Sequence, residues 1–123
     1  MTMQDREYQA MQFICTQIKL LAPKDTWNLT NNGIRIVQVG PGSFEVRVGG
    51  ETAPYGVMLN KEGVHKGWIN KIVTDCTPTI RKIMMGSLSR EEIQDLIGAS
   101  ENKLEDKRAN HIARKERELA SLI

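Results

Sequence analysis

The sequence changes near residue 33 from a helical spacing of apolar side chains to a strict alternation, and this change constrains the fold most. Residues 33–39 are rich in β-branched side chains, and in residues 44–49 apolar side chains alternate with charged or small ones. The intervening Gly40-Pro41-Gly42 provides the fixed and positive φ angles that a tight reversal needs. The sequence therefore predicts an antiparallel hairpin with one apolar face and one polar face.

An amphipathic helix is predicted before the hairpin, over residues 4–21. Its apolar side chains recur at steps of three and four residues, among them Met11, Ile14, Ile18 and Leu21. Pro23 ends this helix, because the residue before a proline is pushed out of the helical region. We expect the helix to cover the apolar face of the hairpin.

A second helical period begins at Trp68 and continues to Met84, with Pro78 inside it. A proline within a helix removes a backbone donor and crowds the preceding turn. Two structures fit the pattern: a helix that kinks at Pro78, or a break after which Thr77 caps a new helix with Pro78 at its first position. We expect Trp68 to anchor this segment, either in the core or in an interface.

A third helix is predicted from about Arg90 toward Leu122. Ser89 and Glu92 form a capping-box pattern at its start. Apolar residues thin out along the helix and leave three isolated among charged neighbours, Leu104, Ile112 and Leu119. Such a narrow stripe is typical of a helix that projects and packs against another chain, or of one held by charge pairs one turn apart.

The length of 123 residues fits one domain. The predicted fold class is α+β, with an N-terminal helix packed on a small antiparallel sheet, then a kinked helix and a long charged C-terminal helix. The sheet is expected to hold the hairpin and a short third strand over residues 55–59. We expect residues 1–88 to form the core domain, and residues 89–123 to form a helical extension of the same unit that provides an interface.

Charge and cysteine content limit the possible functions. The net charge of +2, from 17 basic and 15 acidic residues, lacks the basic excess of a protein that binds nucleic acid through phosphates, so no specific nucleic-acid binding is expected. No stretch reaches the ~18 consecutive apolar residues of a membrane span, so we expect a cytosolic chain without a membrane partner. Cys15 and Cys76 are expected to be buried reduced thiols, with a disulfide as the alternative.

No residue pattern typical of an active site or a cofactor is apparent. His65 has Glu62 nearby but no serine or cysteine context for a nucleophile, and His111 is expected to be solvated or at an interface. Gly40 and Gly42 lie between two strands rather than before a helix, so they do not form a phosphate loop. We therefore expect no enzyme, no cofactor and no metal site. The enzyme alternative, a nuclease-like or toxin domain, would use His65 and Glu62.

Four short segments follow one another in a particular order. They are Ala22-Pro23, Asp25-Thr26-Trp27-Asn28-Leu29, Ala53-Pro54-Tyr55 after the hairpin, and the helix start Lys66-Gly67-Trp68-Ile69. Over about residues 4–85 this order resembles the tail-completion and head–tail joining proteins of long-tailed bacteriophages. Trp27 stands where the family has glycine, and the family's acidic-Tyr-Gly sequence is missing after Tyr55.

The resemblance implies a structural role in the virion that needs no chemistry and no cofactor. Members of this family form rings between head and tail, which implies a homo-oligomeric ring, hexameric or dodecameric, that binds portal or adaptor proteins and tail proteins. The residues expected at partner interfaces are Phe44, Tyr55, Trp68, Leu104, Ile112 and Leu119. The alternative is a small cytosolic interaction module that oligomerises through its C-terminal helix.

Overall fold

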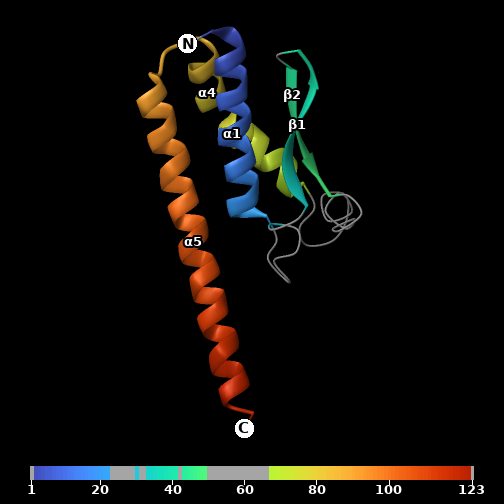
Figure 1. The fold of residues 1–123 in the computed structure, drawn as a ribbon, viewed down its shortest axis with the longest axis vertical. Helices are drawn as coiled ribbons and strands as arrows, with labels where there is room; N and C mark the ends of the chain where they lie inside the picture. Colours follow the sequence, from blue (N-terminus) through green and yellow to red (C-terminus); the bar gives the residue numbers. More distant parts are fainter. Residues whose placement is uncertain (1, 23–29, 31–32, 42, 50–66, 123) are drawn as a thin grey trace.

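The computed structural model describes residues 2–22, 30, 33–41, 43–49 and 67–122 (Figure 1). The order of elements in this part of the chain is α1 (Met3–Leu21), β1 (Ile34–Gly40), β2 (Ser43–Val48), α4 (Trp68–Met84) and α5 (Arg90–Ala120). The predicted α+β class is confirmed, and the fold is mostly helical. The third strand predicted over residues 55–59 lies outside the described residues, as do Glu62 and His65.

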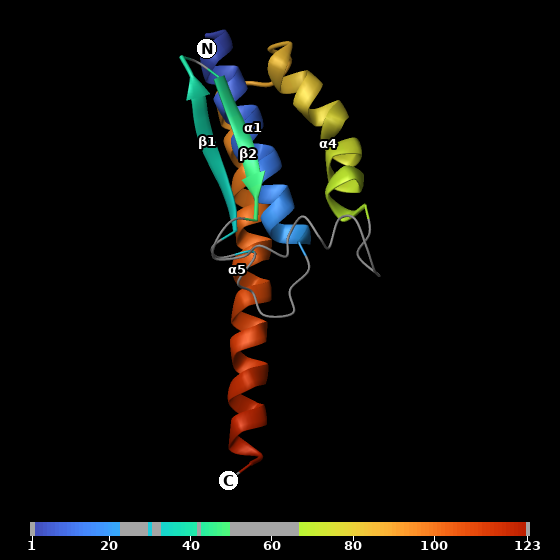
Figure 2. The same ribbon diagram turned by 90° about the vertical axis from the view of Figure 1, so that its right-hand side faces the viewer.

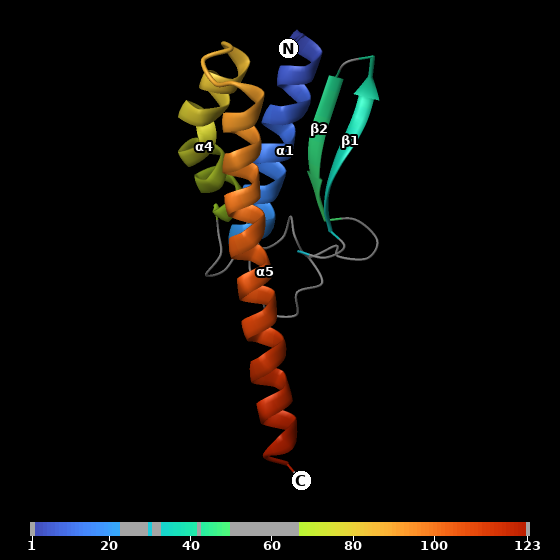
Figure 3. The ribbon, with the colours of Figure 1, turned by 60° about the vertical axis from the view of Figure 1, so that its left-hand side comes forward.

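Helix α1 is the central element, because it contacts all four of the others. Figures 2 and 3 show the hairpin on one side of α1 and the other two helices around the rest of it. The helix begins with a capping box, in which the backbone N–H of Asp5 donates to Oγ1 of Thr2 and the N–H of Thr2 donates to the Asp5 carboxylate, both at 3.1 Å. The hydrogen bond from the Thr2 backbone N–H to the carboxylate, followed by the interaction with the Thr2 side chain, holds the pKa of Asp5 below its ordinary value.

The predicted hairpin is confirmed, and its two strands pair antiparallel. Ile36 lies opposite Val46 on the face toward the core, whereas Arg35 lies opposite Arg47 on the exposed face. The covering of one face by α1 is also confirmed, since α1 contacts both strands. Alternation of apolar and charged residues along β2 therefore sets which face of the sheet is buried.

Helix α4 runs without a break through Pro78, so the alternative in which Thr77 caps a new helix is wrong. The Thr77 hydroxyl instead donates to the carbonyl oxygen of Val73 within the same helix, at 2.8 Å. Pro78 is exposed, while Cys76 and Ile83 on either side of it are buried. Burial on both sides offsets the ~3 kcal/mol that an interior proline costs a helix. Figure 2 shows α4 bending along its length.

Among the residues that the structure describes, the main core joins the three helices to the inner face of the sheet. Its buried members come mainly from α1, α4 and the start of α5, and they include Phe13, Ile14, Ile18, Trp68, Ile72, Ile83, Ile93 and Ile97. Cys15 and Cys76 are both buried free thiols, as predicted, and burial raises the pKa of each. The start of the predicted extension thus belongs to the core.

The turn between α4 and α5 depends on one glycine. Gly86 has a φ of 75°, in the left-handed region. The guanidinium of Arg6 lies directly over it, so a Cβ at this position would come within 2.8 Å of Nη2 of Arg6. Helix α5 begins shortly afterwards with the predicted capping box of Ser89 and Glu92. The turn therefore fixes the direction in which α5 leaves the body of the protein.

Candidate partner interface

Helix α5 is much longer than the elements it packs against. It has 31 residues, which corresponds to about 46 Å at 1.5 Å per residue, and its C-terminal end extends beyond every other element (Figures 1 and 3). We call residues 90–106 the proximal segment and residues 107–120 the distal segment. The two segments are one continuous helix, but their surroundings differ.

The proximal segment packs on α1 through one stripe of side chains. Ile93, Ile97, Ser100 and Leu104 are the buried residues of α5, and they follow one another at steps of four, three and four residues. The side chain of Gln17 donates a hydrogen bond to the Ser100 hydroxyl at the middle of this contact. Burial of this stripe holds the proximal segment against α1.

The contact between α5 and α1 finishes where α1 ends. Leu20 and Leu104 form a small separate buried cluster there. The ammonium group of Lys107 donates to the carbonyl oxygen of Leu20 at 3.3 Å, at the C-terminal end of α1, where carbonyls lack helical partners. Beyond this point, none of the residues of α5 is buried.

The distal segment exposes apolar side chains to solvent. Ile112 is 50% exposed and Leu119 is 63% exposed, and Leu122 just after the helix is 82% exposed. Charge pairs within the helix include Lys115 with Glu118 at 3.2 Å. Surface pairs of this kind contribute only about 0.3–0.5 kcal/mol. The exposed apolar residues identify the distal segment as the candidate interface.

The structure separates five of the six predicted interface residues into three groups. Ile112 and Leu119 are exposed on the distal segment, whereas Trp68 (8% exposed) and Leu104 (6%) are buried in packing within the chain. Phe44 is half-buried against Tyr8 of α1, with ring centroids 5.1 Å apart, and Tyr55 lies outside the described residues. Only the first group offers a partner a clearly exposed apolar surface.

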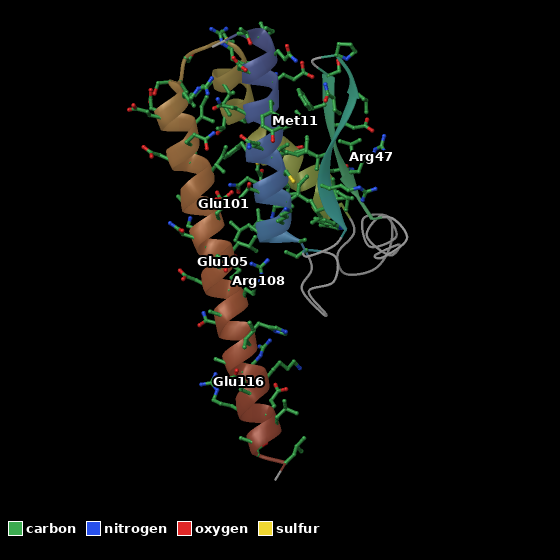
Figure 4. All side chains as sticks on the ribbon, in the orientation of Figure 1. Met11, Arg47, Glu101, Glu105, Arg108 and Glu116 are labelled. Carbon is green, nitrogen blue, oxygen red and sulfur yellow. The ribbon has the colours of Figure 1, made fainter. Side chains whose placement is uncertain are left out.

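A pocket lies between the end of α1 and the middle of α5, and it was not predictable from the sequence because its walls are far apart in the chain. Its volume is about 420 Å³, and a smaller pocket of about 160 Å³ adjoins it along α1. Both are lined by Thr16, Lys19 and Glu101, and the larger one also by Glu105 and Arg108, which form an ion pair (Figure 4).

The lining of this pocket is mostly polar and charged. Its charged groups come in both signs, and its lining residues do not include a cysteine or a histidine in the larger part. Within the described part of the chain, no group of three or more His, Cys, Asp or Glu residues could hold a metal ion. Among the described helices, none is both long enough and apolar enough to cross a membrane.

Comparison with known proteins gives no further guide to the function. No protein-family model, no curated protein and no solved structure matches this chain.

Proposed function

We propose that this chain is a structural protein of a long-tailed bacteriophage, located at the head–tail junction of the virion, where it assembles into a ring with portal or tail proteins. The sequence supports this proposal through the order of Ala22-Pro23, residues 25–29 and Ala53-Pro54-Tyr55 around the hairpin. An α+β fold in which a helix precedes a hairpin and further helices follow is compatible with that order. The role requires no catalytic residue, cofactor or metal ion.

The observation that carries the proposal is the distal segment of α5. A helix that leaves its own core and exposes Ile112 and Leu119 is stabilised only weakly by contacts within the chain. Isolated exposed apolar residues are ordinary on a protein surface, but on a helix that has left its own core they favour burial against another protein. In a ring, each copy would bury this segment against a neighbouring protein.

Electron microscopy of purified virions tests the proposal. We expect density for this chain in a symmetric ring at the neck or tail end, with the distal segment buried against a neighbour. Particles that carry Ile112→Ser and Leu119→Ser should show reduced occupancy of this ring, while Val73→Ser, an exposed apolar residue on α4, serves as the matched control. Complete virions that lack the chain would overturn the proposal.

A cytosolic interaction module that oligomerises through α5 is the second candidate, and the same exposed segment favours it. A chain that ends at Ala109 keeps Leu104 and Lys107 in place but lacks most of the distal segment. The module predicts that this shortened chain is a folded monomer, and that the full chain oligomerises without any virion component. Recovery of the protein from infected cells but not from particles would favour the module over the joining protein.

A further inference from the structure

The hairpin forms a sheet of two strands in the described part of the chain. In such a sheet each strand pairs on one side only and leaves its other edge without a partner strand. Figure 2 shows that β2 lies on the side toward α4, whereas no described element lies beyond β1 on its other side. The edge of β1 is therefore the more open of the two.

The register shows which backbone groups of β1 point away from β2. The N–H of Gly49 donates to the carbonyl oxygen of Gly33 at 2.6 Å. Hydrogen-bonded pairs occur at every second residue of an antiparallel ladder, so Arg35 and Val37 are the next residues of β1 that bond to β2. The residues that direct their N–H and C=O groups outward are Ile34, Ile36 and Gln38. Within the described part of the chain, no backbone hydrogen bond outside the ladder reaches these three residues.

The edge of β2 is partly occupied by the chain itself. Phe44 lies opposite Gln38, and its N–H donates to the carboxylate of Glu7 on α1 at 3.2 Å. This contact agrees with the alternation, because it shows that the N–H of Phe44 points away from β1. Another strand could bond fully to β2 only by displacing Glu7. The edge of β1 has no such contact among the described residues.

The groups along β1 match the chemistry of another extended strand. A donor and an acceptor recur together at every second residue, roughly 6.6–6.8 Å apart, which is the repeat of a β-strand. Extended chains add to open sheet edges through main-chain hydrogen bonds of this kind. Among the described strands, β1 itself is the one whose outer edge is available along its whole length.

We infer that β1 of a second copy of the chain pairs antiparallel with this edge, around a two-fold axis at Ile36. In this register Ile36 lies opposite Ile36 of the other copy and Ile34 lies opposite Gln38, so the outward groups of all three residues are bonded. Arg35 lies opposite Val37, whereas an axis at Arg35 would place two arginines opposite each other, which is repulsive. A two-fold contact closes on two copies, so it differs from a contact that repeats around a ring.

A pocket beside the edge of β1 fits the side chain that this pairing brings. The smaller pocket, of about 160 Å³, is lined by Ile36 and by no described residue of β2, so it lies on the open side of β1. Cys15 and Ile97 provide the rest of its apolar lining. Residues opposite each other in a ladder have Cβ atoms roughly 4.5–5.5 Å apart, so Ile36 of the second copy reaches this pocket. A cavity of roughly 150 Å³ holds a group as large as benzene, so an isoleucine side chain fits.

Sedimentation equilibrium of the purified full-length protein tests the pairing, which goes beyond the proposed function and does not rest on it. We expect an equilibrium between monomer and dimer without any virion component. Gln38→Pro removes an outward N–H but spares the ladder to β2, so it should weaken the dimer about tenfold or more. Gln38→Thr is the matched control, because both variants lose the side-chain hydrogen bond to the carbonyl oxygen of Gly40 and only the control keeps the N–H. It should change the dissociation constant by less than about twofold.

Substitution of Val37 separates the contact between copies from the stability of the hairpin. Val37 lies opposite Glu45 within the chain and opposite Arg35 across the inferred contact. Val37→Glu should therefore destabilise the monomer slightly but tighten the dimer about threefold to tenfold, and Val37→Lys should have the reverse effects. Urea unfolding at low concentration measures the monomer. Effects of opposite sign on the two equilibria would not arise from a change in folding alone.

Amide hydrogen exchange locates the contact. Protection of the Ile36 amide should rise about tenfold or more with protein concentration, while the Val37 amide, bonded to β2, stays protected throughout. Protection of Ile36 in the monomer would mean that the same chain covers this edge, for example with the third strand predicted over residues 55–59, and would overturn the inference. A monomer at every concentration, or a dimer that responds neither to Gln38→Pro nor to the substitutions of Val37, would also overturn it.

Discussion

The proximal and distal segments of α5 belong to one helix but are stabilised in different ways. The proximal segment buries Ile93, Ile97 and Leu104 against the rest of the chain, so packing holds it. The distal segment buries none of its residues, and beyond the hydrogen bond from Lys107 to Leu20 at its start the contacts found for it among the described residues are local ones. Helical structure by itself therefore says little about whether a segment belongs to the core or to an interface.

The length of α1 sets the boundary between the two segments. Leu20 packs against Leu104 close to the end of α1, and the chain places no other described helix or strand beside α5 beyond that level (Figures 1 and 3). The helix continues because adding a residue to an existing helix avoids the cost of nucleation. The distal segment is also rich in Ala, Lys, Arg and Glu, which are strong helix formers.

The largest expected effect comes from a pair of matched substitutions, one in each segment. Ile93 is 0% exposed, so Ile93→Ala should lower the free energy of unfolding by about 3–4 kcal/mol through lost burial and a cavity. Ile112 is half exposed, so Ile112→Ala should lower it by less than about 1 kcal/mol. Urea unfolding of both variants at low protein concentration measures the difference. Equal losses would mean that the distal segment packs within its own chain.

A second prediction concerns the turn that directs the proximal segment onto α1. Gly86→Ala forces a non-glycine residue into a φ of 75° and displaces the guanidinium of Arg6, which together should cost about 1–2 kcal/mol. Gly98→Ala is the control, because this glycine lies within α5 with open space around it. It should raise the stability by about 0.5–1 kcal/mol through helix propensity. Thermal unfolding shows whether each substitution raises or lowers the melting temperature. A stabilising Gly86→Ala would show that the turn does not constrain α5.

The elements with strong local signals were predictable from the sequence. Alternation in residues 44–49 fixed the hairpin, and the spacing of Ser89 and Glu92 located the start of α5. Both signals act between residues close together in the chain. At Pro78 the sequence left a kinked helix and a broken helix as alternatives, and local signals could not decide between them, because burial of Cys76 and Ile83 against other elements holds α4 together.

The candidate site was predictable only in part, for the same physical reason. Ile112 and Leu119 stand out among charged neighbours, and the structure leaves them exposed. Leu104 gives the same signal in the sequence but is buried by Leu20, a residue far away in the chain. Sequence spacing cannot distinguish these two outcomes, since the distinction depends on where α1 ends relative to α5.

A third prediction, with a smaller expected loss of stability, compares the two ends of α5. The hydroxyl of Ser89 accepts a hydrogen bond from the backbone N–H of Glu92 at 3.1 Å, so Ser89→Ala should cost about 1 kcal/mol. Ser121→Ala at the other end removes a hydroxyl that donates to the carbonyl oxygen of Glu118 at 2.7 Å, where the helix has no tertiary contact to lose. Ser121→Ala should lower the free energy of unfolding by about a few tenths of a kcal/mol at most. Chemical unfolding distinguishes the two, and similar costs at both ends would contradict the separation between packed and projecting segments.

The smallest expected effect lies within the distal segment itself. Glu118→Gln keeps the shape of the side chain but removes its ion pair with Lys115, in which both side chains are 55% exposed. Because solvent screens such a pair, the cost should be about 0.2–0.5 kcal/mol, and it should vanish at about 1 M salt. Native-state amide hydrogen exchange is the suitable measurement, since it reports fraying of the distal segment separately from global unfolding. Faster exchange confined to residues near Glu118, with the amides around Ile97 unchanged, is the expected result. Faster exchange in both segments together would mean that α5 opens as one unit, and that the boundary at Leu104 has no energetic meaning.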